Sequence, residues 1–129
     1  MRRIEPPLSV DRINTVLYCR RWRETVAFYQ DVIGFPVETQ NDWFVEFGVA
    51  EHAFLSVADA GRATIEPVEG RGITLTMHTS DLTAAWSRLD GSAHAPMPIT
   101  RRWGADVFYC HDPEGHRIEF WSEPGDTAP

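Results

Sequence analysis

Histidine, cysteine and the carboxylates carry out most protein chemistry, and this chain shows few of them in a recognisable pattern. Its histidines stand at His52, His78, His94, His111 and His116. None of them forms the HxH or HExxH spacing that brings two imidazoles to one metal ion. His111 and His116 flank a turn, and His52 and His94 lie in expected loops, so we expect these four to be solvated. The sequence therefore predicts no histidine-based metal centre.

A nucleophile with an adjacent base is equally hard to find. The chain has no GxSxG turn and no glycine-rich phosphate loop. Cys110 stands next to His111, but neighbouring residues of a strand point to opposite faces, so this pair cannot act together. The two cysteines, Cys19 and Cys110, are too few for a disulfide framework. We expect two buried thiols and a reducing, cytoplasmic location.

Composition excludes several classes of partner. The chain has 129 residues, of which 43% are hydrophobic and 24% charged, as is usual for one globular domain. Its 12 Lys and Arg against 19 Asp and Glu give a net charge of −7, which disfavours nucleic acid and anionic membranes. No apolar run is long enough to span a bilayer, and the first residues lack the apolar stretch of a signal peptide. We therefore expect a soluble protein that binds neither nucleic acid nor a membrane.

The predicted elements follow the same order twice. In the first half, a strand is followed by a helix that ends at Gly34 and by three short strands. These elements are expected at Ile13–Cys19, Arg23–Ile33, Phe35–Gln40, Trp43–Phe47 and Ala53–Ala58. In the second half, Asp81 is the expected N-cap of the helix. The elements there are expected at Ile73–Thr79, Leu82–Leu89, Pro98–Arg101, Ala105–Cys110 and Arg117–Trp121.

This repeat predicts an α+β fold of two tandem βαβββ modules, at about residues 10–68 and 71–123, within one domain that covers residues 1–129. Two such modules can curve their sheets around one cleft and keep the helices outside.

Two stretches resemble a known family. "AFYQDVIGF" (Ala27–Phe35) is similar to the first helix-to-strand junction of the vicinal oxygen chelate superfamily, and "VFYCHDPEGHRIEFW" (Val107–Trp121) closely resembles its last hairpin. The resemblance covers nearly the whole chain. It implies a U-shaped cleft and, usually, a homodimer. The family includes metal-dependent glyoxalases, extradiol dioxygenases and fosfomycin-modifying enzymes, as well as metal-free bleomycin-binding resistance proteins, to which this chain is most similar.

The resemblance also implies four metal-ligand positions, on the first and last strand of each module. Here they are occupied by Asn14, by Leu55 or Ser56, by Thr74 and by Glu119. A bound transition metal needs about three or four donors such as imidazole, carboxylate or thiolate, and only Glu119 qualifies. We therefore predict no metal and no other cofactor.

An extradiol dioxygenase is excluded as well. Tyr109 and Glu119 match part of the dioxygenase signature, but the histidine expected several residues before the tyrosine is missing from the stretch 100–104.

A cleft without a metal is expected to be a binding site. Aromatic residues make up 12% of the chain, and tryptophan and tyrosine offer flat apolar surface to planar ligands. The expected ligand-binding residues are Asn14, Trp43, Phe47, Thr74, Thr76, His78, Trp103, Tyr109, Glu119 and Trp121. The acidic net charge favours a cationic or neutral aromatic ligand. The leading hypothesis is sequestration of a natural product such as an antibiotic.

Three alternatives stay open at this point. A lyase or isomerase could use Glu119 as general base, with Tyr109 or His78, with or without a divalent metal. Arg101 and Arg102 could pair with a carboxylate, although two solvated arginines are the commoner case. The modules could pair within one chain or between chains, where the stiff Pro6-Pro7 segment could reach across to a partner.

Overall fold

The computed structural model describes residues 7–125, which form two modules of the same element order. The first module comprises β1 (Ile13–Cys19), α1 (Trp22–Ala27), a π-helical turn η1 (Phe28–Ile33), β2 (Val37–Gln40), β3 (Phe44–Ala50), β4 (Ala53–Asp59) and a short 3-10 turn, η2 (Ala60–Arg62). The second comprises β5 (Thr74–His78), α2 (Leu82–Asp90), β6 (Thr100–Arg102), β7 (Ala105–His111) and β8 (Arg117–Ser122). Each predicted strand is present, with its ends shifted by at most a few residues.

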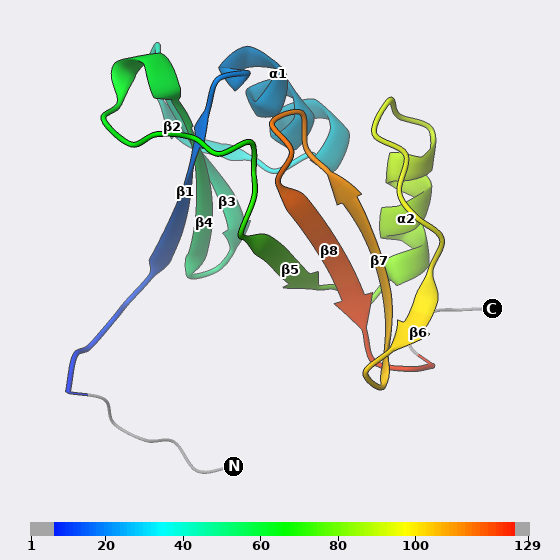
Figure 1. Cartoon of the computed structure of the whole chain (residues 1–129). Helices are drawn as coiled ribbons and strands as arrows, with labels where there is room; N and C mark the ends of the chain where they lie inside the picture. Colours follow the sequence, from blue (N-terminus) through cyan, green and yellow to red (C-terminus); the bar gives the residue numbers. More distant parts are fainter. Residues whose placement is uncertain (1–6, 126–129) are drawn as a thin grey trace.

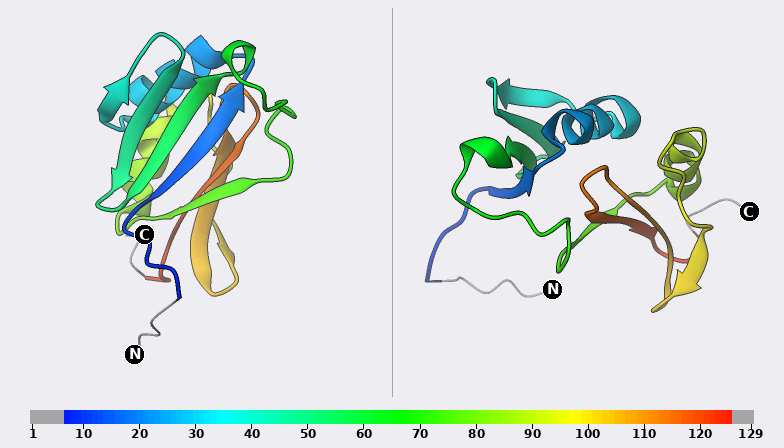
Figure 2. Two further views of the ribbon diagram at one scale, coloured as in Figure 1. Left: turned by 90° about the vertical axis from the view of Figure 1, so that its left-hand side faces the viewer. Right: turned by 45° about the horizontal axis from the view of Figure 1, so that its top comes forward.

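The strands form two four-stranded sheets with the orders β1-β4-β3-β2 and β5-β8-β7-β6. In each sheet the first and last strands of the module pair in parallel, and the remaining pairs are antiparallel. Figures 1 and 2 show the two sheets side by side, each with one helix, joined by the long segment between β4 and β5. This arrangement confirms the predicted α+β fold of two βαβββ modules.

One face of each sheet is covered by helices and carries the core. In the first module this face presents Leu17, Cys19, Val45, Phe47, Leu55 and Val57. In the second it presents Phe108, Cys110, Ile118 and Phe120, and both sets belong to one hydrophobic cluster. Because side chains alternate along a strand, the intervening residues project from the opposite side. We call that side the open face; it is defined by Asn14, Glu46 and Ser56 in the first sheet and by Val107, Tyr109, Arg117, Glu119 and Trp121 in the second.

The predicted helix Arg23–Ile33 is divided between α1 and η1. The wider π-helical turn leaves two consecutive aromatic residues, Phe28 and Tyr29, both buried. Gly34 ends it with a φ of 92°, where a Cβ atom would lie 2.7 Å from Arg88 Nη2. Arg88 comes from α2, and its Nε donates a hydrogen bond to the carbonyl of Val32 (2.7 Å). The end of the first helix is therefore stabilised by the second module. None of the described helices is long and apolar enough to cross a membrane.

A buried carboxylate joins the two modules. Asp112, in the β7–β8 turn, accepts a hydrogen bond from the hydroxyl of Tyr29 at 2.7 Å, and His116 Nδ1 lies 2.8 Å from the same oxygen. Its other oxygen accepts three backbone N–H groups, those of residues 114, 115 and 116. His116 is buried, so the expectation that it is solvated is wrong. The expectation for His116 was based on the turn sequence alone, and that sequence does not reveal that the turn packs against η1.

These contacts decide the charge of Asp112. Burial by itself would raise the pKa of its carboxyl, but the hydrogen bond and charge of His116, together with the Tyr29 hydroxyl, hold that pKa below its usual value. Asp112 is therefore an anion in the folded protein at neutral pH. Burial and the neighbouring Asp112 charge raise the pKa of the Tyr29 hydroxyl, which remains a hydrogen-bond donor.

Two glycines allow the segment between the modules to cross this turn. A Cβ atom on Gly70 would lie 2.3 Å from the backbone of Gly115, and one on Gly115 would lie 2.4 Å from the Glu69 carbonyl oxygen. Both glycines also have positive φ angles. Only residues without side chains permit this contact between two backbones.

Candidate functional site

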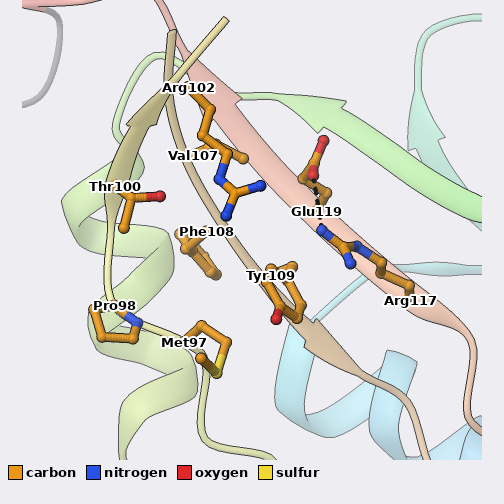
Figure 3. Close-up of a pocket in the computed structure, with 9 residues that line it drawn as sticks. All are labelled: Met97, Pro98, Thr100, Arg102, Val107, Phe108, Tyr109, Arg117 and Glu119. Carbon is orange, nitrogen blue, oxygen red and sulfur yellow. Dashed lines mark ion pairs between the residues drawn. The ribbon is translucent and has the colours of Figure 1, made fainter.

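A small pocket lies on the open face of the second sheet. It has a volume of about 100 Å³ and is formed by β6, β7, β8 and the segment before β6. Its lining residues are Met97, Pro98, Thr100, Arg102, Val107, Phe108, Tyr109, Arg117 and Glu119. In Figure 3 the side chains of Arg102, Tyr109 and Arg117 converge on one space in front of the sheet. The sheet thus supplies the floor of the pocket, to which the edge strand β6 contributes Arg102 and the inner strand β8 contributes Arg117 and Glu119.

The polar groups of this pocket are arranged around Tyr109. The guanidinium carbon of Arg117 lies 3.8 Å from the centre of the Tyr109 ring, a cation–π contact. Arg117 Nη2 also lies 3.6 Å from Glu119 Oε2. Tyr109 and Glu119 are direct partners across the β7–β8 pair. Glu119 is partly exposed, with 26% of its side chain accessible. The pocket therefore combines an aromatic ring, two guanidinium groups and one carboxylate.

The open face of the first sheet carries a separate polar network. Glu46 Oε2 accepts hydrogen bonds at 3.2 Å from both Asn14 Nδ2 and Arg12 Nη2. Ser56 donates to Asn14 Oδ1 at 2.9 Å, and the Arg12 guanidinium lies 3.7 Å above the Phe54 ring. The amide of Asn14 is thus held by two neighbours. Of the two residues proposed for the fourth strand, Ser56 projects from the open face, whereas Leu55 lies in the core.

The family's metal positions do not fit a metal ion here. They carry an amide, two hydroxyls and one carboxylate, and the amide is already engaged by Glu46 and Ser56. Within residues 7–125, no three His, Cys, Asp or Glu side chains are grouped so that they could hold a metal. This donor set is poor for a transition metal, which prefers imidazole, thiolate or several carboxylates.

The cysteines supply no nucleophile either. Both are free and buried, as predicted. Burial, followed by the charge of Glu114, raises the pKa of the Cys19 thiol to about 12, and burial followed by the Asp112 charge raises that of Cys110 to about 11. Each thiol is therefore protonated at neutral pH and behaves as a small apolar side chain.

Several of the predicted site residues do share the open face of the second sheet. Thr76 pairs with Glu119 and His78 with Trp121 across the parallel β5–β8 pair, and Thr74 pairs with Arg117. The rings of His78 and Trp121 meet edge to face with centroids 4.6 Å apart. His78 Nε2 lies 2.6 Å from Glu123 Oε2. These residues extend the face beyond the pocket toward the sheet edge at β5.

Three predicted aromatic residues lie elsewhere. Phe47 is fully buried beside Tyr29 in the core, so its placement in the cleft is wrong. Both faces of β3 carry phenylalanine, and Phe47 is on the face that belongs to the core. Trp43 is half-buried just before β3 and packs edge-on against Phe44. Trp103 is 97% exposed at the tip of the β6–β7 hairpin, with a φ of 54°.

Of the two basic residues of the site, the sequence interpretation missed Arg117 and named Arg102 only together with Arg101, as arginines that could pair with a carboxylate. Arg117 shares strand parity with Glu119, a signal that could have placed it in the pocket. Arg102 lies on the edge strand β6, whose register with β7 the sequence does not reveal.

A family model matches residues 10–120 of the chain, and its description is glyoxalase/bleomycin resistance protein/dioxygenase superfamily. The chain belongs to this superfamily. Among curated proteins, no sequence matches the chain. Membership gives the architecture of the two modules but not the reaction or the ligand.

Solved structures with the same fold differ in their described roles. A lactoylglutathione lyase from Agrobacterium tumefaciens has a TM-score of 0.72 at 18% identity, covering 95% of this chain and 97% of that one. TnmS3, an antibiotic binding protein from Streptomyces sp. CB03234, has a TM-score of 0.74 at 17% identity, covering 92% and 99%. A glyoxalase/bleomycin resistance protein/dioxygenase from Nocardioides has a TM-score of 0.71 at 20% identity, covering 95% and 88%. The superfamily fold thus occurs in an enzyme and in a binding protein.

Proposed function

We propose that this protein binds a planar small molecule, such as an antibiotic or another natural product, and sequesters it without a metal ion. The observation that carries the proposal is the pocket on β6, β7 and β8, in which an aromatic ring and polar groups surround an open space. Two of the family's metal positions, Asn14 and Ser56, hydrogen-bond to each other, and Asn14 also binds Glu46, so they do not present free donors. A rigid floor with a few placed polar groups is what small-molecule recognition requires.

The superfamily neighbours support this proposal at the level of the fold. TnmS3 is described as an antibiotic binding protein, and its structure covers nearly the whole chain. Binding without chemistry needs a shaped and partly apolar surface, and Val107, Tyr109 and Met97 supply such a surface here.

Tryptophan fluorescence tests the proposal, because Trp121 lies on the same open face as the pocket. A panel of glycopeptide and polycyclic antibiotics, titrated in the presence of EDTA, should include at least one ligand that binds with a micromolar dissociation constant. Tyr109→Ala should weaken that ligand about tenfold, because a stacked aromatic contact contributes about 1 kcal/mol beyond simple burial. No micromolar binding to any member of the panel would count against the proposal.

A second candidate is a metal-independent lyase or isomerase. Glu119 is the one carboxylate among the residues that line the pocket, and it lies beside Tyr109. In the same titrations, product formation from a bound compound that Glu119→Gln abolishes while binding survives would favour this enzyme. Binding without product by the wild-type protein favours sequestration.

We also propose that the protein is a homodimer whose sites combine both subunits. The second module alone lines the pocket, which leaves the open face of the first module free to cover the pocket of a partner. Leu8 and Val10, just before β1, are 77% and 75% exposed, and Trp103 is almost fully exposed. In such a dimer these side chains would be available for contact with the partner. Pro7 belongs to this segment, while Pro6 lies outside the described residues.

Sedimentation at low micromolar concentration should give about twice the chain mass of 14.7 kDa. Ligand titration should then saturate at one molecule per chain. A monomer that still binds ligand one to one would contradict the shared site. A cytoplasmic location, which suits two buried free thiols, stays a prediction.

A further inference from the structure

The adjacent arginines Arg101 and Arg102 of β6 point to opposite sides of the sheet and have different surroundings. Arg101 Nε lies 2.6 Å from Asp106 Oδ1, so its charge is compensated by the neighbouring strand. Arg102 points to the other side of the sheet and lines the pocket together with Thr100. In Figure 3 its side chain passes Val107, and the guanidinium points toward Tyr109. Among residues 7–125, Arg102 has neither an ion pair nor a hydrogen bond with another side chain.

The local charge of the pocket is opposite to that of the whole chain. Its lining holds two arginines, Arg102 and Arg117, against one carboxylate, Glu119. Arg117 is already engaged, since it stacks on Tyr109 and lies 3.6 Å from Glu119. The positive charge of Arg102 is therefore not compensated by an ion pair, although the net charge of the protein is −7. A guanidinium presents a planar set of N–H donors that matches the two oxygens of a carboxylate.

The size of the pocket limits what can enter it. An enclosed apolar cavity of about 150 Å³ holds one benzene ring, and this pocket is smaller and open, at about 100 Å³. It therefore accommodates one end of a ligand, namely a carboxylate with part of the ring that bears it. The rest of a planar molecule would extend over the open face toward Trp121, which pairs with Val107.

We infer that the pocket selects a planar aromatic molecule that carries a carboxylate, and that Arg102 is the residue that anchors this group. The inference rests on the proposed function and specifies its ligand class. It replaces the cationic ligand that the net charge of the chain suggested, because the charge nearest to the ligand decides recognition. Tyr109 and Val107 contact the ring, and Thr100 offers a hydroxyl at the edge of the same space.

The test compares two probes of the same shape, 2-naphthoate and its neutral analogue 2-naphthamide, by calorimetric titration of the full-length protein. The wild type should bind naphthoate about tenfold more tightly than naphthamide, the size of one charge-assisted hydrogen bond at a partly exposed site. Arg102→Gln should abolish this preference. Arg101→Gln removes the same charge from the neighbouring residue on the other face and should leave the preference intact.

Each other outcome overturns the inference. Equal binding of the two probes shows that the pocket accepts a planar ligand without reading its charge, in which case the proposed binding function survives. Equal loss of the preference in both variants shows a general effect of net charge and not an anchor at Arg102. If neither probe binds, a carboxylate on a ring is not the recognised group, and the antibiotic panel then decides the proposed function independently.

Discussion

Replacing Asp112 by asparagine should lower the free energy of unfolding by about 3–5 kcal/mol, because removing one member of a buried charged pair leaves the other uncompensated. The carboxylate is fully buried and accepts hydrogen bonds from Tyr29, His116 and three backbone N–H groups. An amide has one acceptor oxygen, so it cannot satisfy both sets of donors. Chemical denaturation followed by circular dichroism measures the loss.

Asp106→Asn is the matched control for this substitution. Asp106 makes a single ion pair with Arg101, whose side chain is 61% exposed. Losing such a pair should cost less than about 1 kcal/mol. If Asp112→Asn does not fold, Tyr29→Phe removes one hydrogen bond to the same carboxylate and should cost about 1.5–3 kcal/mol. Equal and small effects of Asp112→Asn and Asp106→Asn would show that Asp112 does not join the modules.

Acid should remove the contribution that the Asp112 carboxylate makes to the free energy of unfolding. The pKa of Asp112 is lowered in the folded state, so below about pH 5 the unfolded chain binds more protons at this site than the folded chain does. The contribution is therefore complete above the usual carboxyl pKa of about 4 and is lost as the pH falls through the lowered folded value. The free energy of unfolding should decline over this range more steeply in the wild type than in Asp112→Asn.

Phe47→Ala should destabilise the protein by about 3–5 kcal/mol, because it removes a fully buried ring from the core. Phe47 is 0% exposed and packs beside Tyr29, with ring centroids 6.2 Å apart. Phe54→Ala is the matched control on the next strand. Phe54 is half-buried on the open face beneath Arg12, so its loss should cost about 1–2 kcal/mol.

Ligand binding by Phe47→Ala and Phe54→Ala also tests whether Phe47 belongs to the core or to the binding surface. At temperatures where both remain folded, Phe47→Ala should leave the affinity for a bound ligand unchanged, since the ring does not reach the pocket. Thermal unfolding and fluorescence titration together measure both effects. A large loss of affinity with little loss of stability in Phe47→Ala would restore the original placement of this residue in the cleft.

The order of the elements along the chain was predictable because alternation and turn residues are local signals. Asp112-Pro113-Glu114-Gly115 marks the last hairpin in the sequence, and the structure places β7 and β8 on either side of it. Which face of a strand meets the helices is not local. In β3, Phe44 and Phe47 lie on opposite faces, so hydrophobicity alone could not indicate the face that carries the core.

The site itself depends on contacts between distant residues. Tyr29 and Asp112 are 83 positions apart, and no pattern in the sequence links them. The role of Arg102 depends on the register of β6, whose strand begins two residues later than the alternation predicted. The pairing of β6 with β7, which sets Arg101 opposite Asp106 and Arg102 opposite Ala105, decides which of the two arginines enters the pocket. Tyr109 and Glu119, by contrast, were placed together correctly because they flank one tight turn.

The most direct test of the account maps a bound ligand on the protein. Backbone amide shifts of ¹⁵N-labelled protein should be followed while the tightest ligand of the antibiotic panel is added in EDTA. Binding in the pocket should produce saturable changes concentrated at Thr100, Val107, Tyr109 and Glu119, which line it. Changes concentrated instead at Phe28 and His94, in the groove between α1 and the loop after α2, would contradict it. So would binding that disappears in EDTA and returns when a divalent metal is restored.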